Sequence, residues 1–302
     1  MDLDARRLRV LHEVGLRGSV TAAAATLHVT PSAVSQQLAQ LEREAGCDLL
    51  ERAGRGVVLT DAGTTLVRHA EVVLRALEGA EAGLAAARGS VVGVVRVGSF
   101  PSAASVLAAP AAARARRRHP ELDVRITEIE DVAGLVDLRA AALDVVIVQE
   151  YDHVPWRAPD GVERHRLATD HLHLVRPRGG HAPTGRLADL ADAQWVASPA
   201  GTPCGTSTLQ ACRDAGFEPD IRHRALDFGL LLDLVAAGLG VALIPGLGLR
   251  HVPREVDVTP LRRPQLKRTI FAATRAAGVG PRRPAIDAFL AELRRVPMPK
   301  PR

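Results

Sequence analysis

The chain has 302 residues, of which 47% are hydrophobic and 24% charged, with a formal net charge of +5, so it can form two or three small domains and mildly favours an anionic partner. No apolar run approaches the roughly 18–20 residues of a membrane span, and the N-terminal MDLDARRLRV lacks the layout of a signal peptide. These features exclude a helical membrane protein, and we expect a cytoplasmic one.

Three short helices are predicted at the start of the chain. The first, over residues 8–15, has its apolar side chains on one stripe and ends at a glycine, and the second is an alanine-rich helix over residues 20–27. Thr30 is a favourable N-cap for the third helix, Pro31 fits its first position, and Gly46 ends it. Two helices joined by a turn of three or four residues are typical of a helix-turn-helix.

A β-hairpin and a long helix are predicted next. Residues 49–52 and 57–59 have the character of two short strands joined by the turn AGRG, and Thr60 can cap a helix over residues 61–88. Apolar residues recur in this helix every three or four positions, which is the pattern of a coiled-coil seam. The pattern favours a linker through which two copies dimerise, and a helix lying on its own domain is the alternative. The seam consists of Leu66, Ala70, Val73, Leu77, Ala80, Leu84 and Ala87.

From Val91 onward, apolar strand-like runs such as VVGVVRVGSF and LDVVIVQE alternate with helical stretches such as DVAGLVDLRAAA. Alternation of this kind predicts parallel α/β layers with buried sheets. Two such series follow one another within residues 91–302, so we expect two lobes.

The charges are distributed unevenly. Residues 1–60 contain seven arginines and seven acidic residues, whereas residues 262–302 contain eleven basic residues against Asp287 and Glu292. Charge alone would therefore place nucleic-acid binding near the C-terminus, while the helix-turn-helix pattern places it near the N-terminus.

The chain contains three cysteines, Cys47, Cys204 and Cys212, which are too few for a disulfide framework. No C-x-x-C motif and no histidine cluster with metal-ligand spacing occurs, so we expect no metal and no cofactor. Cys204 and Cys212 are eight positions apart near a predicted helix start, about 12 Å along a helix, whereas a disulfide requires Cα atoms within about 7 Å. We expect buried or half-buried thiols and keep a redox switch as an alternative.

Residues 1–88 resemble the N-terminal region of LysR-type transcriptional regulators, and the remainder resembles their effector-binding domain. The motifs that carry the resemblance are GSVTAAAATLHVTPSAVSQQLAQLEREAG, then LLERAGRGVVLTDAG, then the long helix. The resemblance implies an α/β protein with a winged helix-turn-helix, a dimerising linker helix and a two-lobed, periplasmic-binding-protein-like (type 2) effector domain. We expect these parts over residues 1–60, 61–90 and 91–302, with lobe I formed by residues 91–167 plus 268–302 and lobe II by residues 168–267.

The third helix is the expected DNA-reading element. With Val34, Leu38 and Leu41 facing inward, its outer face is rich in hydroxyl and amide groups that can hydrogen-bond to base edges. The family often carries Arg where this chain has Gln36, so the target sequence cannot be transferred. Together, the outer face, the second helix, the wing and the resemblance predict DNA contacts for Thr21, Pro31, Ser32, Ser35, Gln36, Gln37, Arg43, Arg52 and Arg55.

The expected effector site lies beyond the carboxyl ends of the strands, where helix N-termini offer free amides. Helix capping is an alternative role for each of its Ser, Thr and Asp residues. Because the predicted set contains two aspartates and no Arg or Lys, it hints at an effector that is neutral or carries an amine. The set consists of Ser99, Phe100, Ser102, Asp131, Gln149, Ser198, Thr202, Pro203 and Asp227.

The predicted partners are operator DNA, a small-molecule effector and a second copy of the chain in a dimer or tetramer, with RNA polymerase as a further candidate. Three alternatives stay open: a redox-sensing regulator that uses Cys204 and Cys212, an enzyme built on the two-lobed domain, and a DNA-organising protein without a ligand. The chain has no G-x-S-x-G, P-loop or H-E-x-x-H motif that would favour the enzyme.

Overall fold

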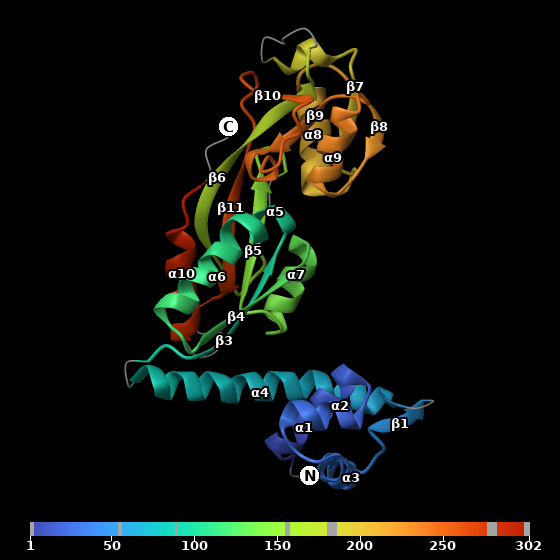
Figure 1. Cartoon of the computed structure of the whole chain (residues 1–302), viewed down its shortest axis with the longest axis vertical. Helices are drawn as coiled ribbons and strands as arrows, with labels where there is room; N and C mark the ends of the chain where they lie inside the picture. The colour runs from blue at the N-terminus through green and yellow to red at the C-terminus, as the bar shows by residue number, and fades with distance from the viewer. Residues whose placement is uncertain are drawn as a thin grey trace. The chain divides into compact units, whose positions relative to one another are not determined.

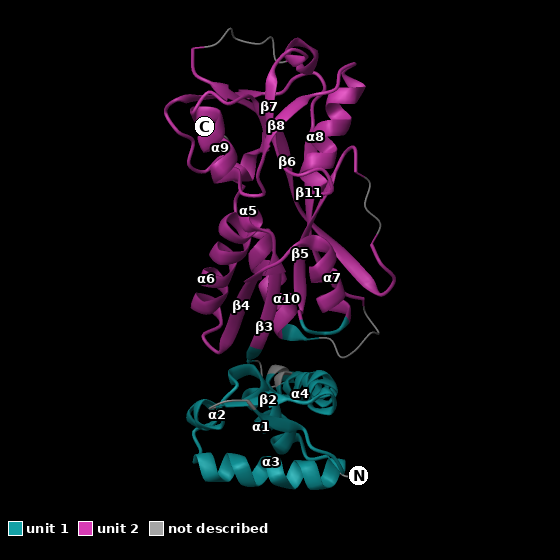
Figure 2. Ribbon diagram, turned by 90° about the vertical axis from the view of Figure 1, so that its right-hand side faces the viewer, with its two compact units in different colours: residues 1–93, 140–142, 281–284 teal, residues 94–139, 143–280, 285–302 magenta. Residues whose placement is uncertain are grey.

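A computed structural model describes residues 3–53, 56–87, 90–154, 158–179, 186–276 and 283–298 (Figure 1). The chain divides into two compact units (Figure 2). Unit 1 consists of residues 1–93 with two short additions, and unit 2 contains most of the remainder. None of the helices in the described ranges combines the length and apolar character needed to cross a membrane.

Unit 1 begins with three capped helices, α1 (Ala5–Arg17), α2 (Val20–Leu27) and α3 (Pro31–Ala45). The side chain of Thr30 accepts a hydrogen bond from the backbone N–H of Ala33 at 3.3 Å, and Gly46 ends α3 in the left-handed conformation. Both features confirm the predicted boundaries of α3.

The predicted end of α1 at Gly15 is wrong, because the helix continues to Arg17 and ends at the left-handed Gly18. Gly15 has a packing role instead, since a Cβ there would come within 2.8 Å of Leu59 Cδ1. A glycine inside the helix therefore lets the wing approach α1.

The core of unit 1 is made by the inner faces of the three helices. Val34 and Leu41 are fully buried and Leu38 nearly so, which confirms the predicted inward stripe of α3. These side chains pack in one cluster with Leu11 and Val14 of α1. Burying apolar side chains of this size stabilises a fold by roughly 1.5–3 kcal/mol each, so this cluster fixes the direction in which the outer face of α3 points.

The wing is an antiparallel hairpin of β1 (Leu50–Ala53) and β2 (Gly56–Leu59), with Leu50 paired to Leu59. Thr60 links it to α4 (Asp61–Ala87) by accepting a hydrogen bond from the Gly63 N–H at 3.0 Å and donating one to the Asp48 carbonyl at 2.9 Å. The hairpin and the long helix both match the elements predicted from the sequence.

Unit 2 contains a seven-stranded sheet in the order β10-β6-β11-β5-β3-β4, with β9 also paired to β6. Strand β3 is parallel to β5, but β6 and β11 are antiparallel to their neighbours, so the expectation of purely parallel layers is wrong. The strands are β3 (Gly93–Ser99), β4 (Leu122–Glu128), β5 (Val145–Tyr151), β6 (Val162–Pro177), β9 (Ala242–Pro245), β10 (Val256–Pro260) and β11 (Lys267–Arg275).

Two long strands connect the lobes of unit 2. Residues 162–171 of β6 pair with β11, whereas residues 172–177 pair with β9 and β10 (Figure 1). A parallel pair, β7 (Gln194–Ala197) and β8 (Asp220–Arg224), forms the other sheet of the second lobe around the fully buried Trp195. The antiparallel crossing strands explain why the sheet is mixed.

The helices of unit 2 follow the strands and present their N-terminal ends beside the strand ends. Thr202 caps α8 through the Gly205 N–H, and Asp227 caps α9 through the Leu230 N–H. The helices are α5 (Pro101–Ala103), which continues through the π-helical turn Ala104–Ala108 into α6 (Ala109–Arg118), then α7 (Asp131–Arg139), α8 (Pro203–Asp214), α9 (Phe228–Ala236) and α10 (Pro284–Arg294), together with the short 3-10 turns Leu187–Leu190 and Gly246–Gly248.

Candidate nucleic-acid interface and ligand cavity

The outer face of α3 is exposed and polar. Pro31, Ser32, Ser35 and Gln36 are exposed, while Gln37 is half-buried. Ser35 donates to the Pro31 carbonyl at 3.1 Å, so its oxygen remains available as an acceptor. Side-chain amides and hydroxyls in this arrangement can read base edges in a major groove.

The carboxylates of α3 are held by unit 1 itself. Glu44 accepts hydrogen bonds from Arg7 at 2.7 and 2.9 Å, and Glu42 accepts from the backbone N–H groups of Leu49 and Leu50 at 2.9 and 3.2 Å. Both acids are therefore occupied by α1 and the wing. Although residues 1–60 contain as many acidic as basic residues, the outer face of α3 therefore carries no unpaired carboxylate among the described residues.

The remaining predicted DNA-contact residues are placed as follows. Thr21 is exposed in the first turn of α2, Arg43 is exposed in the last turn of α3, and Arg52 is exposed on β1. Arg43 donates a hydrogen bond to the side-chain oxygen of Gln40. Arg55 lies outside the described residues.

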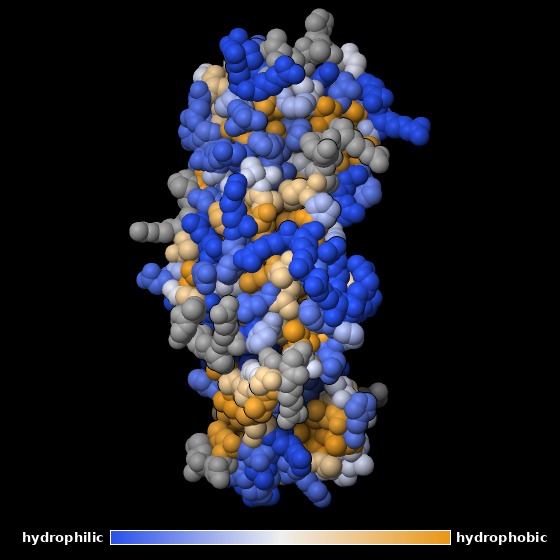
Figure 3. All heavy atoms as spheres, turned by 90° about the vertical axis from the view of Figure 1, so that its left-hand side faces the viewer, coloured by the Kyte–Doolittle hydropathy of each residue, from blue (hydrophilic) through white to orange (hydrophobic). Residues whose placement is uncertain are grey.

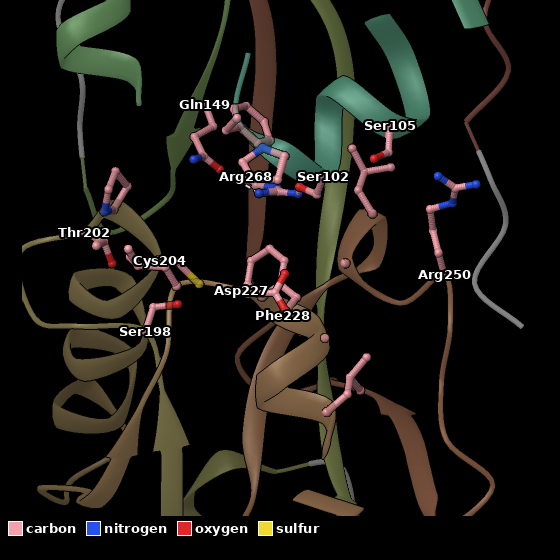
Figure 4. Close-up of a pocket in the computed structure, with 18 of the residues that line it drawn as sticks. Ser102, Ser105, Gln149, Ser198, Thr202, Cys204, Asp227, Phe228, Arg250 and Arg268 are labelled. Atoms are coloured by element: carbon pink, nitrogen blue, oxygen red, sulfur yellow. Dashed lines mark hydrogen bonds between the residues drawn. The ribbon is translucent and has the colours of Figure 1, made fainter. Parts of the chain in front are cut away.

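Unit 2 encloses a cavity of about 330 Å³ (Figure 4). Seven of the nine residues predicted for the effector site line it, and they come from the segments 100–149 and 198–227 of unit 2. The polar part of its wall combines hydroxyl and amide groups with charged side chains, the carboxylates of Glu130 and Asp227 among them, and its apolar part includes two phenylalanine rings and three leucines. The predicted residues that line the cavity are Phe100, Ser102, Gln149, Ser198, Thr202, Pro203 and Asp227.

Ser99 and Asp131 do not line the cavity. Ser99 is fully buried, and its hydroxyl donates to the Phe100 carbonyl at 3.1 Å. Asp131, only 6% exposed at the start of α7, accepts a hydrogen bond from the Gln149 N–H at 3.0 Å. Burial raises the pKa of Asp131 to about 7 despite this hydrogen bond.

A buried arginine that the sequence analysis did not single out lies at one wall of the cavity (Figure 4). Arg268 is 1% exposed and forms an ion pair with Asp170, with Nε and Nη2 at 2.9 and 2.8 Å from one carboxylate oxygen. Its other N–H groups donate to Gln149 at 2.6 Å, Tyr151 at 3.3 Å and Ser102 at 3.1 Å. All five N–H groups of the guanidinium thus have a partner.

The Arg268 contacts connect separate elements. Ser102 lies on α5, Gln149 on β5 and Asp170 on β6, and Asp170 also accepts from the Leu247 N–H at 3.3 Å. A ligand that displaced one of these donors or acceptors would therefore act on several elements of unit 2 at once. In the sequence, Arg268 is one of two adjacent basic residues in LKRTIF, and this pattern does not identify its partners.

Two further basic residues, Arg250 and His251, also line the cavity. The premise of the amine-type effector, a site without Arg or Lys, is therefore wrong. The guanidinium of Arg268 is matched by Asp170, whereas Arg250 is exposed and has no ion-pair partner among the described residues. Arg250 is thus the basic group that an anionic ligand can reach.

The two cysteines of unit 2 lie on the same helix, α8, and both are buried. Cys204 lines the cavity, and burial raises its pKa. Burial also raises the pKa of Cys212, to about 12, with a contribution from the charge of Glu218. Both side chains are therefore thiols at neutral pH, which slows their reaction with oxidants.

The sequence matches two family models over almost its whole length. Residues 5–64 match the bacterial regulatory helix-turn-helix protein model of the lysR family, and residues 88–297 match the LysR substrate binding domain. The chain belongs to the LysR family. It is a DNA-binding transcriptional regulator with an effector-binding domain, not an enzyme.

This LysR-family regulator is similar in sequence to two regulators of known name. The HTH-type transcriptional regulator ShiR of Corynebacterium glutamicum (strain R) is 32% identical over 245 residues, covering 78% of this chain and 81% of the relative. A hydrogen peroxide-inducible genes activator of Pectobacterium carotovorum subsp. carotovorum is 30% identical over 260 residues, covering 82% of each.

Solved structures support the same fold. A probable transcriptional regulator from Pseudomonas aeruginosa has a TM-score of 0.74 at 19% identity, covering 98% of this chain and 97% of that one. Full-length CbnR complexed with its target DNA has a TM-score of 0.67 at 24% identity, covering 98% and 100%. At these identities the likeness concerns the fold alone.

Proposed function

We propose that the cavity of unit 2 binds a small organic anion with an apolar body, and that this effector modulates operator binding or promoter activation. The observation that carries the proposal is Arg250, which has no ion-pair partner in the part of the chain that the structure describes, together with the serine, threonine and glutamine side chains of the cavity wall. A carboxylate bound there would gain charge-assisted hydrogen bonds, which are roughly twice as strong as neutral ones.

The apolar wall defines the rest of the effector. Phe100, Phe228, Leu226, Leu232 and Leu247 line the cavity. A volume of about 330 Å³ is near the lower end of the range for ligand sites. Both features favour a compact metabolite over a large or purely polar one.

The DNA-binding part of the proposal assigns base contacts to Ser32, Ser35 and Gln36, supported by their exposure on α3. The arginines of the wing and of α3 would hold phosphates, as would the N-terminus of α2 near Thr21. Such a regulator acts where the chromosome is, in the cytoplasm, and activation would add RNA polymerase as a partner.

Dimerisation through α4 completes the proposal, and a tetramer would need a further interface. Val73, Leu77 and Leu84 on the predicted seam are 44%, 41% and 66% exposed, although Leu66 and Ala70 pack into the core of unit 1. An exposed aliphatic row on a helix of 27 residues is typical of a coiled-coil surface.

A redox sensor is the second candidate, since several relatives, the Pectobacterium protein among them, are named for hydrogen peroxide and Cys204 lines the cavity near Arg268. The raised pKa values of both thiols, and their placement on one helix, favour the metabolite sensor. Peroxide treatment followed by thiol counting separates the two: a metabolite sensor keeps both thiols of unit 2.

The effector proposal is tested by calorimetry with the full-length protein and a panel of aromatic and aliphatic monocarboxylates, each with its uncharged amide as a control. We expect at least one acid to bind and its amide not to bind. Arg250→Gln should weaken that binding about tenfold, whereas Arg254→Gln, an exposed arginine that does not line the cavity, should not. Binding of amides or amines alone would refute the anionic class.

A further inference from the structure

The basic ends of two helices converge in unit 2. The last turn of α6 carries Arg116, Arg117 and Arg118, and α10 ends at Arg294 and Arg295 follows it. These segments are more than 170 residues apart in the sequence, yet Arg114 of α6 bonds to Glu292 of α10. We call Arg114, Arg116, Arg117, Arg118, Arg294 and Arg295 the arginine cluster.

A single buried carboxylate organises the cluster. Glu292 is 2% exposed, and Arg114 donates to it at 2.9 Å, while Arg295 donates to its other oxygen. Arg118 lies 3.7 Å from the same carboxylate. The arginines remain 39%, 59% and 46% exposed for Arg114, Arg118 and Arg295, so the carboxylate fixes their positions while leaving part of each guanidinium accessible.

The cluster carries an excess of positive charge. Six arginines against Glu292 leave an excess of five charges, equal to the formal net charge of +5 for the whole protein. Asp287 of α10 and Glu121, which follows α6, reduce the excess to three. By contrast, residues 1–60 have no net charge. The hydrophilic surface on the side of unit 2 that carries α6 and α10 can be followed in Figure 3.

Stabilisation of the helix ends does not account for this arrangement. A basic side chain near a helix C-terminus is worth roughly 0.3–1 kcal/mol, and the effect is confined to the last turn. One or two arginines would supply it. Arg116 and Arg117 are exposed and form no ion pair among the described residues. These two exposed positive charges therefore point to a binding partner with negative charge outside the chain.

We propose that the arginine cluster is a second, sequence-independent DNA-binding site, which contacts the phosphate backbone of duplex DNA. Guanidinium groups held in place by Glu292 lose less side-chain freedom on binding phosphate than free arginines do. Each phosphate contact releases a counterion, so the cluster contributes affinity without base specificity. The winged helix-turn-helix selects the sequence, and the cluster strengthens the complex on any duplex.

The test uses full-length protein and a fluorescent 60-bp duplex of random sequence, with affinity measured between about 50 and 200 mM salt. The variant Arg116→Gln/Arg117→Gln spares the arginines bonded to Glu292. It should lower the slope of log affinity against log salt by about 2, since each lost phosphate contact removes about 0.9. The matched control Arg262→Gln/Arg263→Gln removes the same charge from another exposed pair in unit 2 and should leave the slope unchanged.

Two results would overturn the proposal. An unchanged slope in the cluster variant would show that these arginines do not contact DNA and would leave an acidic protein surface as their partner. An equal decrease in both variants would show that only the total charge matters. Circular dichroism and thermal melting, expected to be the same for all three proteins, establish that any change reflects binding and not unfolding.

Discussion

Replacement of Arg268 by Met should strongly destabilise unit 2. The substitution removes the two contacts to Asp170, of 2.8 and 2.9 Å. It also removes the N–H groups that donate to Gln149, Tyr151 and Ser102. Asp170 is 4% exposed and, among the described residues, would keep just the Leu247 N–H, 3.3 Å from each carboxylate oxygen. Breaking a buried ion pair from one side typically costs about 3–5 kcal/mol, because an uncompensated charge remains.

The second variant, Arg268→Met/Asp170→Leu, separates the loss of the pair from the loss of packing. Removing both charges should recover a large part of the stability, since a buried pair contributes little beyond an apolar replacement of similar volume. Urea unfolding followed by tryptophan fluorescence reports on unit 2, because the fully buried Trp195 lies in its second lobe. Two results would show that Asp170 is not left as an uncompensated buried charge. One is a loss of less than about 1 kcal/mol in the free energy of unfolding of the single variant, and the other is a double variant as unstable as the single one.

Further predictions concern the DNA face, the linker helix and the buried acid. Gln36→Ala should weaken operator binding by about 1–3 kcal/mol, the value of one bidentate base contact, in fluorescence anisotropy, and equal loss on a scrambled duplex would exclude base reading. Leu77→Glu/Leu84→Glu should produce monomers in sedimentation experiments, while Thr64→Glu on the opposite side of α4 should not. Because the pKa of Asp131 is raised to about 7, the folded state holds a proton that the unfolded chain releases near pH 4. Its stability should therefore fall as pH rises from about 4 to 7, by at most about 1.4 kcal/mol per unit. Asp131→Asn should remove this contribution, and an unchanged pH profile would contradict the buried-acid assignment.

Local patterns predicted the architecture of unit 1 well. The positions of α3 follow from a capping threonine, a proline at the first position and a left-handed glycine, all adjacent in the sequence. Its buried face follows from the spacing of Val34, Leu38 and Leu41. The exception is Gly15, which was taken as a helix end because its role depends on Leu59 in the wing, 44 residues away.

The ligand cavity was predicted only in part, since its electrostatics depend on contacts between distant segments. Residues that follow strands were found because the carboxyl ends of strands gather at one edge of a sheet. Arg268 was missed because its partners Ser102, Gln149 and Asp170 lie on three other elements. Ser99 and Asp131 were placed in the cavity because spacing gives no information on which neighbouring residue points inward.

An anion in the cavity should change how this regulator binds its operator. The most direct measurement is a footprint and affinity titration on an operator selected from genomic DNA, with and without the acid identified by calorimetry. We expect the acid to change the affinity or the length of the footprint for the wild-type protein, and to do so at about tenfold higher concentration for Arg250→Gln. An operator complex that is identical with and without saturating acid would contradict the account.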